Sequence, residues 1–170
     1  MNFDEYLASL DLNTSKKELS NLYQNFEVIR DFFNMKLSQG RIDNRIVRKY
    51  KDRIIDALYL DSNFEGGLDI DRVGVVMKQI RKNPNYYYFI RIGLFAIEEC
   101  TRVANQYGGS YGEEFYEYFE DLFKEVIKVI VREGLQDELR IQVESVVNGA
   151  FEGYGHYDQL LAIYNLPHKW

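Results

Sequence analysis

The chain has 170 residues, of which 46% are hydrophobic and 28% charged, and only two are proline. This composition argues against intrinsic disorder and favours one globular domain built from long regular elements. The net charge of −6 argues against nucleic acid as the partner. The acidic N-terminus argues against a secretory signal, and the lack of an 18-residue apolar run argues against a membrane span. The lone Cys100 cannot form an internal disulfide, so we expect a cytoplasmic protein with an inert buried thiol.

Apolar residues recur at helical spacing along the chain, and no segment alternates with the period of a strand. Ser15 and Glu18 form a potential capping box, which predicts the start of a helix that ends at Gly40. A shorter and less regular helix is expected before it, over residues 2–10. Two further helices are expected after it, over 44–60 and 70–80.

The central helix is expected to begin at Asn83, with Asn83 as the N-cap and Pro84 at the first helical position. From Tyr86 to Ile97 only Arg91 is charged, and apolar residues cover nearly every direction of the helix. A helix that is apolar all round must be surrounded by other elements. We therefore expect this helix, paired with the one that follows it, to form the centre of the core.

Ser110 and Glu113 form a second potential capping box, which predicts the next helix over about 110–132. A seventh helix is expected over 139–150, followed from about residue 149 by a glycine-containing tail with one short helical turn at 160–164. The sequence thus predicts a single all-α domain over 1–170, an irregular antiparallel bundle of about seven helices. Stacked helical hairpins are the alternative, which the absence of a fixed repeat disfavours.

Two parts of the chain resemble a known family. The segment from Leu19 to Phe33 contains LYQNFEVIRDFF, and the segment from Gly93 to Val129 contains LFAIEECTRVANQYG followed by FYEYFEDLFKEVIKV. These segments resemble an uncharacterised bacterial family of small all-helical proteins, known as a domain of unknown function, over Phe3 to Ile130. The resemblance implies a helical fold and a bacterial cytosol, and it implies no activity or catalytic residue.

The segment between the third and fourth expected helices resembles an EF-hand calcium loop. Position twelve, where the EF-hand places a bidentate glutamate, is Arg72. We therefore predict an inactive loop, in which Asp69 or Asp71 caps the next helix. The calcium-like positions are Asp61, Asn63, Glu65 and Asp69.

Other charged segments carry weaker signals. The basic run from Arg41 to Arg53 contains Asp52 and is followed by Asp56, as on an ordinary solvated helix face. The Glu117-x-x-Glu120 spacing resembles half of the metal site of helical nucleotide pyrophosphohydrolases, but the second half is missing. His156 and His168 lack the Glu-x-x-His context of a di-iron bundle. We predict no metal site, no cofactor and no catalytic residue.

One stripe of the central helix holds Arg91, Glu98, Arg102 and Asn105. It either faces water or lines a polar groove, with Tyr87 at its edge, that could hold an anionic ligand or an acidic side chain of a partner. The sequence leaves open whether Arg91 is buried.

The chain contains 14 tyrosines and 11 phenylalanines, and aromatic residues are favoured at interfaces. We therefore expect a non-enzymatic protein–protein interaction module whose partner is another protein, and a homo-oligomer is allowed. The alternative is a small-ligand-binding protein or a metal-dependent nucleotide-processing enzyme.

Overall fold

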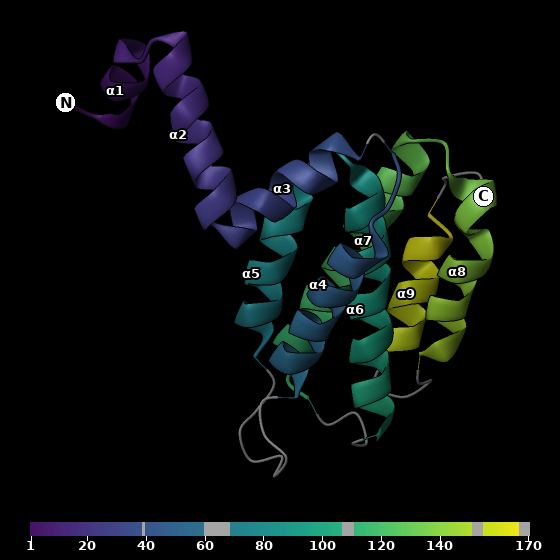
Figure 1. Cartoon of the computed structure of the whole chain (residues 1–170). Coiled ribbons are helices and arrows are strands. Elements are labelled where there is room, and N and C mark those ends of the chain that lie inside the picture. Colours follow the sequence, from purple (N-terminus) through teal and green to yellow (C-terminus); the bar gives the residue numbers. More distant parts are fainter. Residues whose placement is uncertain (39, 60–68, 107–110, 151–154, 167–170) are drawn as a thin grey trace.

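The computed structural model describes residues 1–38, 40–59, 69–106, 111–150 and 155–166. All regular structure in these residues is helical, which confirms the all-α prediction. None of the helices in this part of the chain combines the length and the apolar run that crossing a membrane requires. The helices in chain order (Figure 1) are α1 (Phe3–Ser9), α2 (Leu12–Asn25), α3 (Glu27–Leu37), α4 (Asn44–Leu58), α5 (Ile70–Arg81), α6 (Tyr86–Gln106), α7 (Glu113–Arg132), α8 (Gln136–Gly149) and α9 (His156–Tyr164).

The described residues contain nine helices, whereas the sequence predicted about seven. The segment predicted as one helix over 15–40 is two helices, because the backbone of Phe26 between α2 and α3 is extended, with φ −117° and ψ 113°. The predicted start at Ser15 was also wrong. Asp11 is the N-cap of α2, and its side chain accepts a hydrogen bond from the backbone N–H of Thr14 at 2.7 Å.

The start of α6 differs from the prediction by a few residues. Asn83 and Pro84 precede the helix, and the Asn83 side chain accepts from the backbone N–H of Asn85 at 3.0 Å. The Asn85 side chain in turn accepts from the backbone N–H of Tyr87 at 3.3 Å, which makes Asn85 the capping residue. The N-cap of α6 is therefore Asn85, and not Asn83 as the sequence predicted.

Helix α7 begins at Glu113, after Gly112, which makes no side-chain cap. Ser110 of the predicted capping box lies outside the described residues, so that prediction is not compared. The C-terminal tail forms the nine-residue helix α9 where the sequence predicted one short turn. Helix α9 packs against α7 and α8, and its Leu160 is completely buried.

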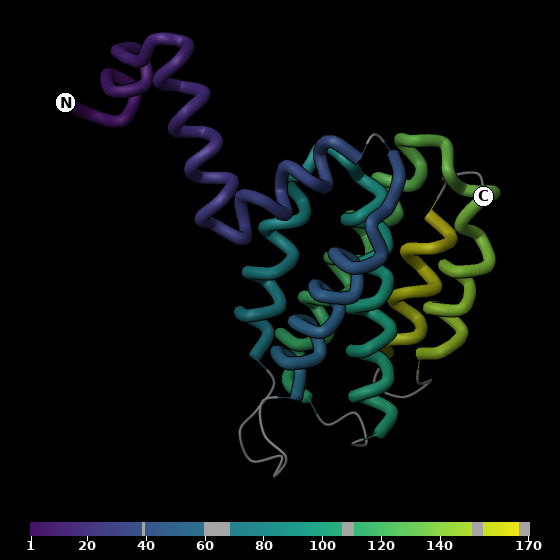
Figure 2. The backbone as a smooth tube through the Cα atoms, viewed as in Figure 1, coloured from purple at the N-terminus to yellow at the C-terminus, as the bar shows by residue number. Residues whose placement is uncertain are grey.

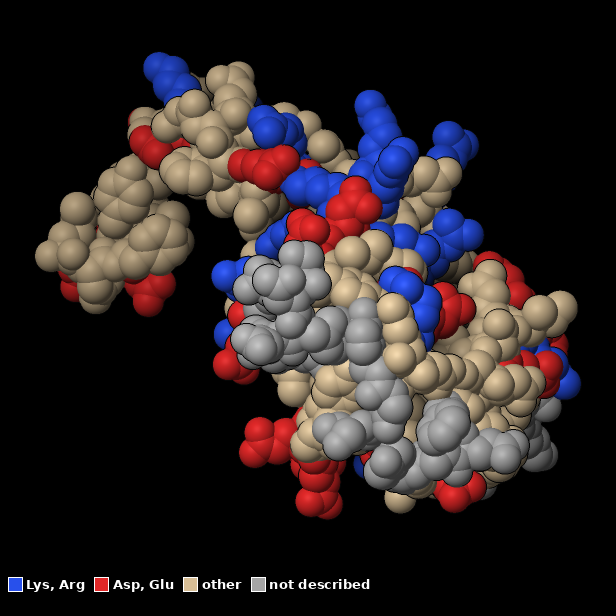
Figure 3. All heavy atoms as spheres, turned by 90° about the horizontal axis from the view of Figure 1, so that it is seen from below, with Lys and Arg blue, Asp and Glu red and all other residues tan. Residues whose placement is uncertain are grey.

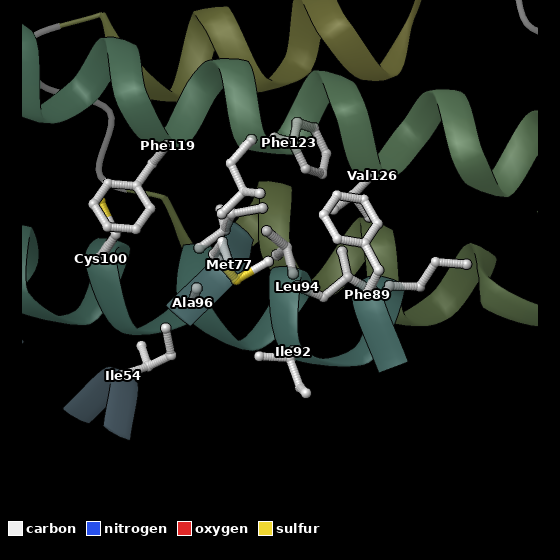
Figure 4. Packing of buried hydrophobic residues seen from close by; sticks show 14 of the residues in the cluster. Ile54, Met77, Phe89, Ile92, Leu94, Ala96, Cys100, Phe119, Phe123 and Val126 are labelled. Carbon is white, nitrogen blue, oxygen red and sulfur yellow. The ribbon is translucent and has the colours of Figure 1, made fainter. Parts of the chain in front are cut away.

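Helix α6 lies at the centre of the fold and packs against α4, α5, α7 and α8. Figure 4 shows this core, to which α5 contributes Met77, α6 contributes Ala96 and α7 contributes Phe123. The burial of most of α6 agrees with its nearly all-round apolar sequence. The one side of α6 that is not covered carries its charged residues.

Helices α1 and α2 contribute nothing to this core. Neither helix has a buried residue. The tube in Figure 2 shows that they project from α3, away from the other helices. We call residues 1–25 the N-terminal arm.

Candidate functional site

The charged side of α6 lines a groove between α4 and α8, which we call the α6 groove. Its first part has a volume of about 440 Å³ and is lined by Val47, Lys51, Arg91, Leu94, Phe95, Glu98, Ile141, Gln142 and Ser145. Its second part has a volume of about 240 Å³ and is lined by Glu98, Thr101, Arg102, Asn105, Ser145, Val146 and Gly149. Glu98 and Ser145 line both parts, so the two parts adjoin.

The structure answers the question about Arg91, because this side chain is exposed. It forms no ion pair or hydrogen bond with any residue that the structure describes. Glu98, a candidate partner from the sequence, lies seven residues further along α6, which is about 10 Å along the helix axis. The guanidinium of Arg91 therefore faces the groove and solvent with its donors available.

Lys51 and Glu98 provide the other charges of the first part. The Lys51 Nζ lies 4.2 Å from the centre of the Phe95 ring, a cation–π contact that joins α4 to α6 in the groove. Burial raises the pKa of Glu98 above its usual value, and the Lys51 charge opposes this rise without cancelling it. The Glu98 side chain is still exposed to the groove, so a ligand group can donate a hydrogen bond to its carboxylate.

Apolar side chains form the floor and one wall of the first part. Leu94 and Val47 are buried beneath it, and Phe95 is half-buried. Ile141 of α8 stands on the opposite wall and is 81% exposed, a large exposure for an isoleucine. The groove therefore combines an apolar floor with charged rims.

The second part is held together by its own polar contacts. Arg102 donates to the Glu99 carboxylate at 2.6 Å and 3.1 Å, so its partner is Glu99 and not Glu98. The Asn105 side chain donates to the carbonyl oxygen of Gly149 at 3.1 Å, at the C-terminal end of α8. The Asn105 hydrogen bond therefore joins α6 to α8, whereas the Arg102 contact lies within α6.

Tyr87 does not line the groove. It lies one helical turn before Arg91, beyond the end of the first part, and its ring centre is 4.8 Å from that of Tyr86. Burial, followed by the charge of Glu138, raises the pKa of the Tyr87 hydroxyl. The structure thus brings four of the five predicted groove residues together and leaves Tyr87 outside.

The calcium-like loop is described only at its end, because Asp61, Asn63 and Glu65 lie outside the described residues. Asp69 is the N-cap of α5 and accepts from the backbone N–H of Arg72 at 3.0 Å. The Arg72 side chain also pairs with Asp69, at 3.1 Å. Asp69 thus has the capping role that the sequence analysis expected.

The basic run forms several local contacts. Arg45 pairs with Asp43 at 2.9 Å, and Lys49 pairs with Glu27 at 2.7 Å. Arg53 donates to the Gln79 side chain at 2.9 Å. The Lys49 and Arg53 contacts connect α4 to α3 and α5, whereas the Arg45 pair lies at the start of α4.

Within the described residues, no three His, Cys, Asp or Glu side chains are placed to hold a metal ion together. Glu117 is exposed, whereas Glu120 lies 3.0 Å from the Nδ1 of the buried His156. His168 lies outside the described residues. The sequence did not reveal the contact between Glu120 and His156, because it joins α7 to α9 across 36 residues.

Cys100 is completely buried in α6. Burial raises the pKa of its thiol well above the usual value, and the charge of Glu120 raises it further. Because the thiolate is the reactive form, this cysteine is protected from chemistry in the folded protein.

Comparison of the chain with protein-family models, with curated proteins and with solved structures finds no match in any of the three. The resemblance to an uncharacterised bacterial family therefore stays a prediction. The functional argument rests on the geometry of the α6 groove.

Proposed function

We propose that this chain is a protein-binding module of the cytoplasm, whose α6 groove holds an amphipathic segment of a partner protein. The observation that carries the proposal is the set of Lys51, Arg91 and Glu98 above an apolar floor, none of them in an ion pair with a described residue. Charged side chains without an ion pair, placed above buried apolar residues, are suited to a partner that supplies charges of the opposite sign.

The chemistry of the groove defines the segment that it would bind. Arg91 and Lys51 favour acidic side chains, and arginine is enriched among residues that dominate binding energy. Leu94, Phe95 and Ile141 would contact apolar side chains on the same segment. A helix with apolar residues at three- and four-residue spacing and acidic residues beside them meets both requirements.

We also infer that the helices form an irregular antiparallel bundle rather than stacked hairpins. The support is that the sequence has no fixed repeat and that α6 is surrounded by α4, α5, α7 and α8. The α6 groove exists because α4 and α8 lie on either side of one central helix.

Site-specific photo-cross-linking tests the proposal in cells that produce the protein. A photoreactive amino acid replaces Ile141, which stands exposed on the groove wall, and in a matched chain it replaces Val75, which is 55% exposed on α5 outside the groove. We expect residue 141 to capture one defined protein through a segment with acidic and apolar residues. Identical adducts from both positions, or no protein adduct from residue 141, would contradict the proposal.

A small anionic ligand is the second candidate for the same groove. The volume of about 440 Å³ supports it, because ligand pockets commonly measure roughly 300–1,000 Å³. Such a ligand would raise the melting temperature of the wild-type protein and not that of Arg91→Ala. A panel of phosphorylated and carboxylated metabolites, followed by thermal unfolding, distinguishes this candidate from a protein partner.

A further inference from the structure

The N-terminal arm and α3 expose more large apolar side chains than the rest of the described chain. The exposed fractions range from 47% to 71% for Phe3, Leu7, Leu12, Leu19, Phe26, Val28 and Leu37. In Figure 3 the arm, at the upper left, is mostly tan with few charged side chains. Contiguous apolar patches larger than roughly a few hundred Å² are uncommon on monomeric soluble proteins and commonly mark an interaction site.

Three of these residues form a regular seam. Leu12, Leu19 and Phe26 are spaced by seven residues, which places them on one face of α2 and its C-cap. The seam is symmetric about Leu19. If a second α2 lies antiparallel to the first, Leu19 meets its own copy and Leu12 meets Phe26.

A groove lies beside this seam, between α2 and α3. It has a volume of about 280 Å³ and is lined by Lys16, Leu19, Ser20, Tyr23, Phe33 and Leu37. The angle between the two helices is fixed by the Tyr23 hydroxyl, which donates to the Asn34 side chain at 2.8 Å, and by the contact of the Tyr23 and Phe33 rings. The groove is therefore preformed and mostly apolar.

The geometry points to a second copy of this chain as the occupant of this groove. We propose that the α2 helices of two copies pair antiparallel about a twofold axis near Leu19, so that each Leu19 enters the groove of the other copy. A twofold interface requires one surface that is complementary to itself, and the symmetric seam meets that requirement.

Charge does not oppose the same arrangement. The C-terminal end of α2 already receives a cation from within the chain, because the Arg30 guanidinium of α3 donates to the Gln24 carbonyl at 3.2 Å. No carboxylate lines the groove between α2 and α3, so an apolar side chain of a second copy can enter it without burying an acidic group. This dimer is independent of the proposed function, because the α6 groove uses none of these residues.

Disulfide trapping in the full chain tests the proposed axis. Leu19→Cys places two thiols across the axis, whereas Lys17→Cys places them on the other side of α2. The native Cys100 does not compete, because it is completely buried. Under a mild oxidant we expect Leu19→Cys to form a covalent dimer roughly tenfold faster than Lys17→Cys, since exchange depends on access and proximity. Equal rates for the two variants would overturn the proposal.

Sedimentation equilibrium provides the second readout. The 20.2 kDa chain should have twice its monomer mass at high micromolar concentration. Leu12→Glu with Leu19→Glu should restore the monomer while the helical circular dichroism signal is retained, because neither side chain is buried in the single chain. A monomeric wild type, or a double variant that stays dimeric, would overturn the proposal. Arg91→Glu should leave the dimer intact, so failure of the dimer and failure of the α6 groove are distinguishable.

Discussion

Gly93 of α6 lies directly beneath Val126 of α7, where the two central helices approach each other. A Cβ at position 93 would lie 2.6 Å from the Val126 Cγ2, a distance that real Cβ contacts do not show. The close approach of α6 and α7 therefore depends on the missing side chain at this glycine.

Gly93→Ala should destabilise the fold by roughly 1–3 kcal/mol, because the added methyl group overpacks the helix contact. Gly74→Ala is the matched control in the interior of α5. Its Cβ would meet only the Tyr118 ring and hydroxyl at 3.8–3.9 Å, an ordinary contact. This control should be neutral or more stable by up to about 1 kcal/mol, since alanine restricts the unfolded chain and favours helix. Urea unfolding of the two variants should separate them, and equal midpoints would refute the packing argument.

Asn85 is expected to be the most sensitive asparagine in the described part of the chain. Its buried side chain donates to Ser38 Oγ at 2.8 Å and to the Arg41 carbonyl at 3.2 Å, besides capping α6 through Tyr87. Asn85→Ala removes these bonds and should cost about 2–4 kcal/mol. Asn105→Ala, which loses one exposed bond, should cost less than about 1 kcal/mol. Chemical unfolding that ranks these two variants in the opposite order would contradict this assignment.

The contact between Glu27 and Lys49 predicts how stability changes with pH. The hydrogen bond from Lys49, and then the Lys49 charge, lower the pKa of Glu27 below 4.5 in the folded protein. The stabilisation from this carboxylate is therefore present above about pH 4.5 and is lost as the pH falls through the folded pKa. Glu27→Gln should be less stable than wild type at pH 7, and the difference should shrink toward pH 3. A difference that is constant between these pH values would argue against the contact.

The helical spacing in the sequence located most of the fold, because amphipathic faces determine where a helix packs. It predicted α4, α5 and α8 to within a few residues. It could not predict the break at Phe26, since an extended residue between two helices interrupts the backbone without interrupting the apolar pattern. It also could not predict that α2 lacks a buried residue, because the spacing of Leu12, Leu19 and Phe26 is the same whether the apolar face is buried or exposed.

Helical spacing also predicted part of the candidate site. Arg91, Glu98, Arg102 and Asn105 share a stripe of one helix, which spacing alone reveals. The facing wall could not be inferred, because Ile141 and Lys51 come from helices that meet α6 only in the folded protein. The pairing of Arg102 with Glu99 was missed because two carboxylates lie within reach of that guanidinium.

Arg91 should contribute little to stability, because its side chain is exposed and unpaired among the described residues. Arg91→Ala should change the free energy of unfolding by less than about 0.5 kcal/mol. A loss of several kcal/mol in urea melts would show that the guanidinium is buried and compensated, and would remove it from the groove rim. Retained stability makes this variant suitable for binding experiments.

The affinity of the partner segment captured through residue 141 is the most direct measure of the central claim. Isothermal titration calorimetry would compare the wild type with the double variant Lys51→Glu, Arg91→Glu. The control is Lys82→Glu, an exposed residue at the C-cap of α5 that does not line the α6 groove. If the α6 groove binds an acidic amphipathic segment, the double variant should bind at least roughly tenfold more weakly, the control should bind like the wild type, and wild-type affinity should fall with added salt. Equal affinity of the double variant and the wild type would contradict the account.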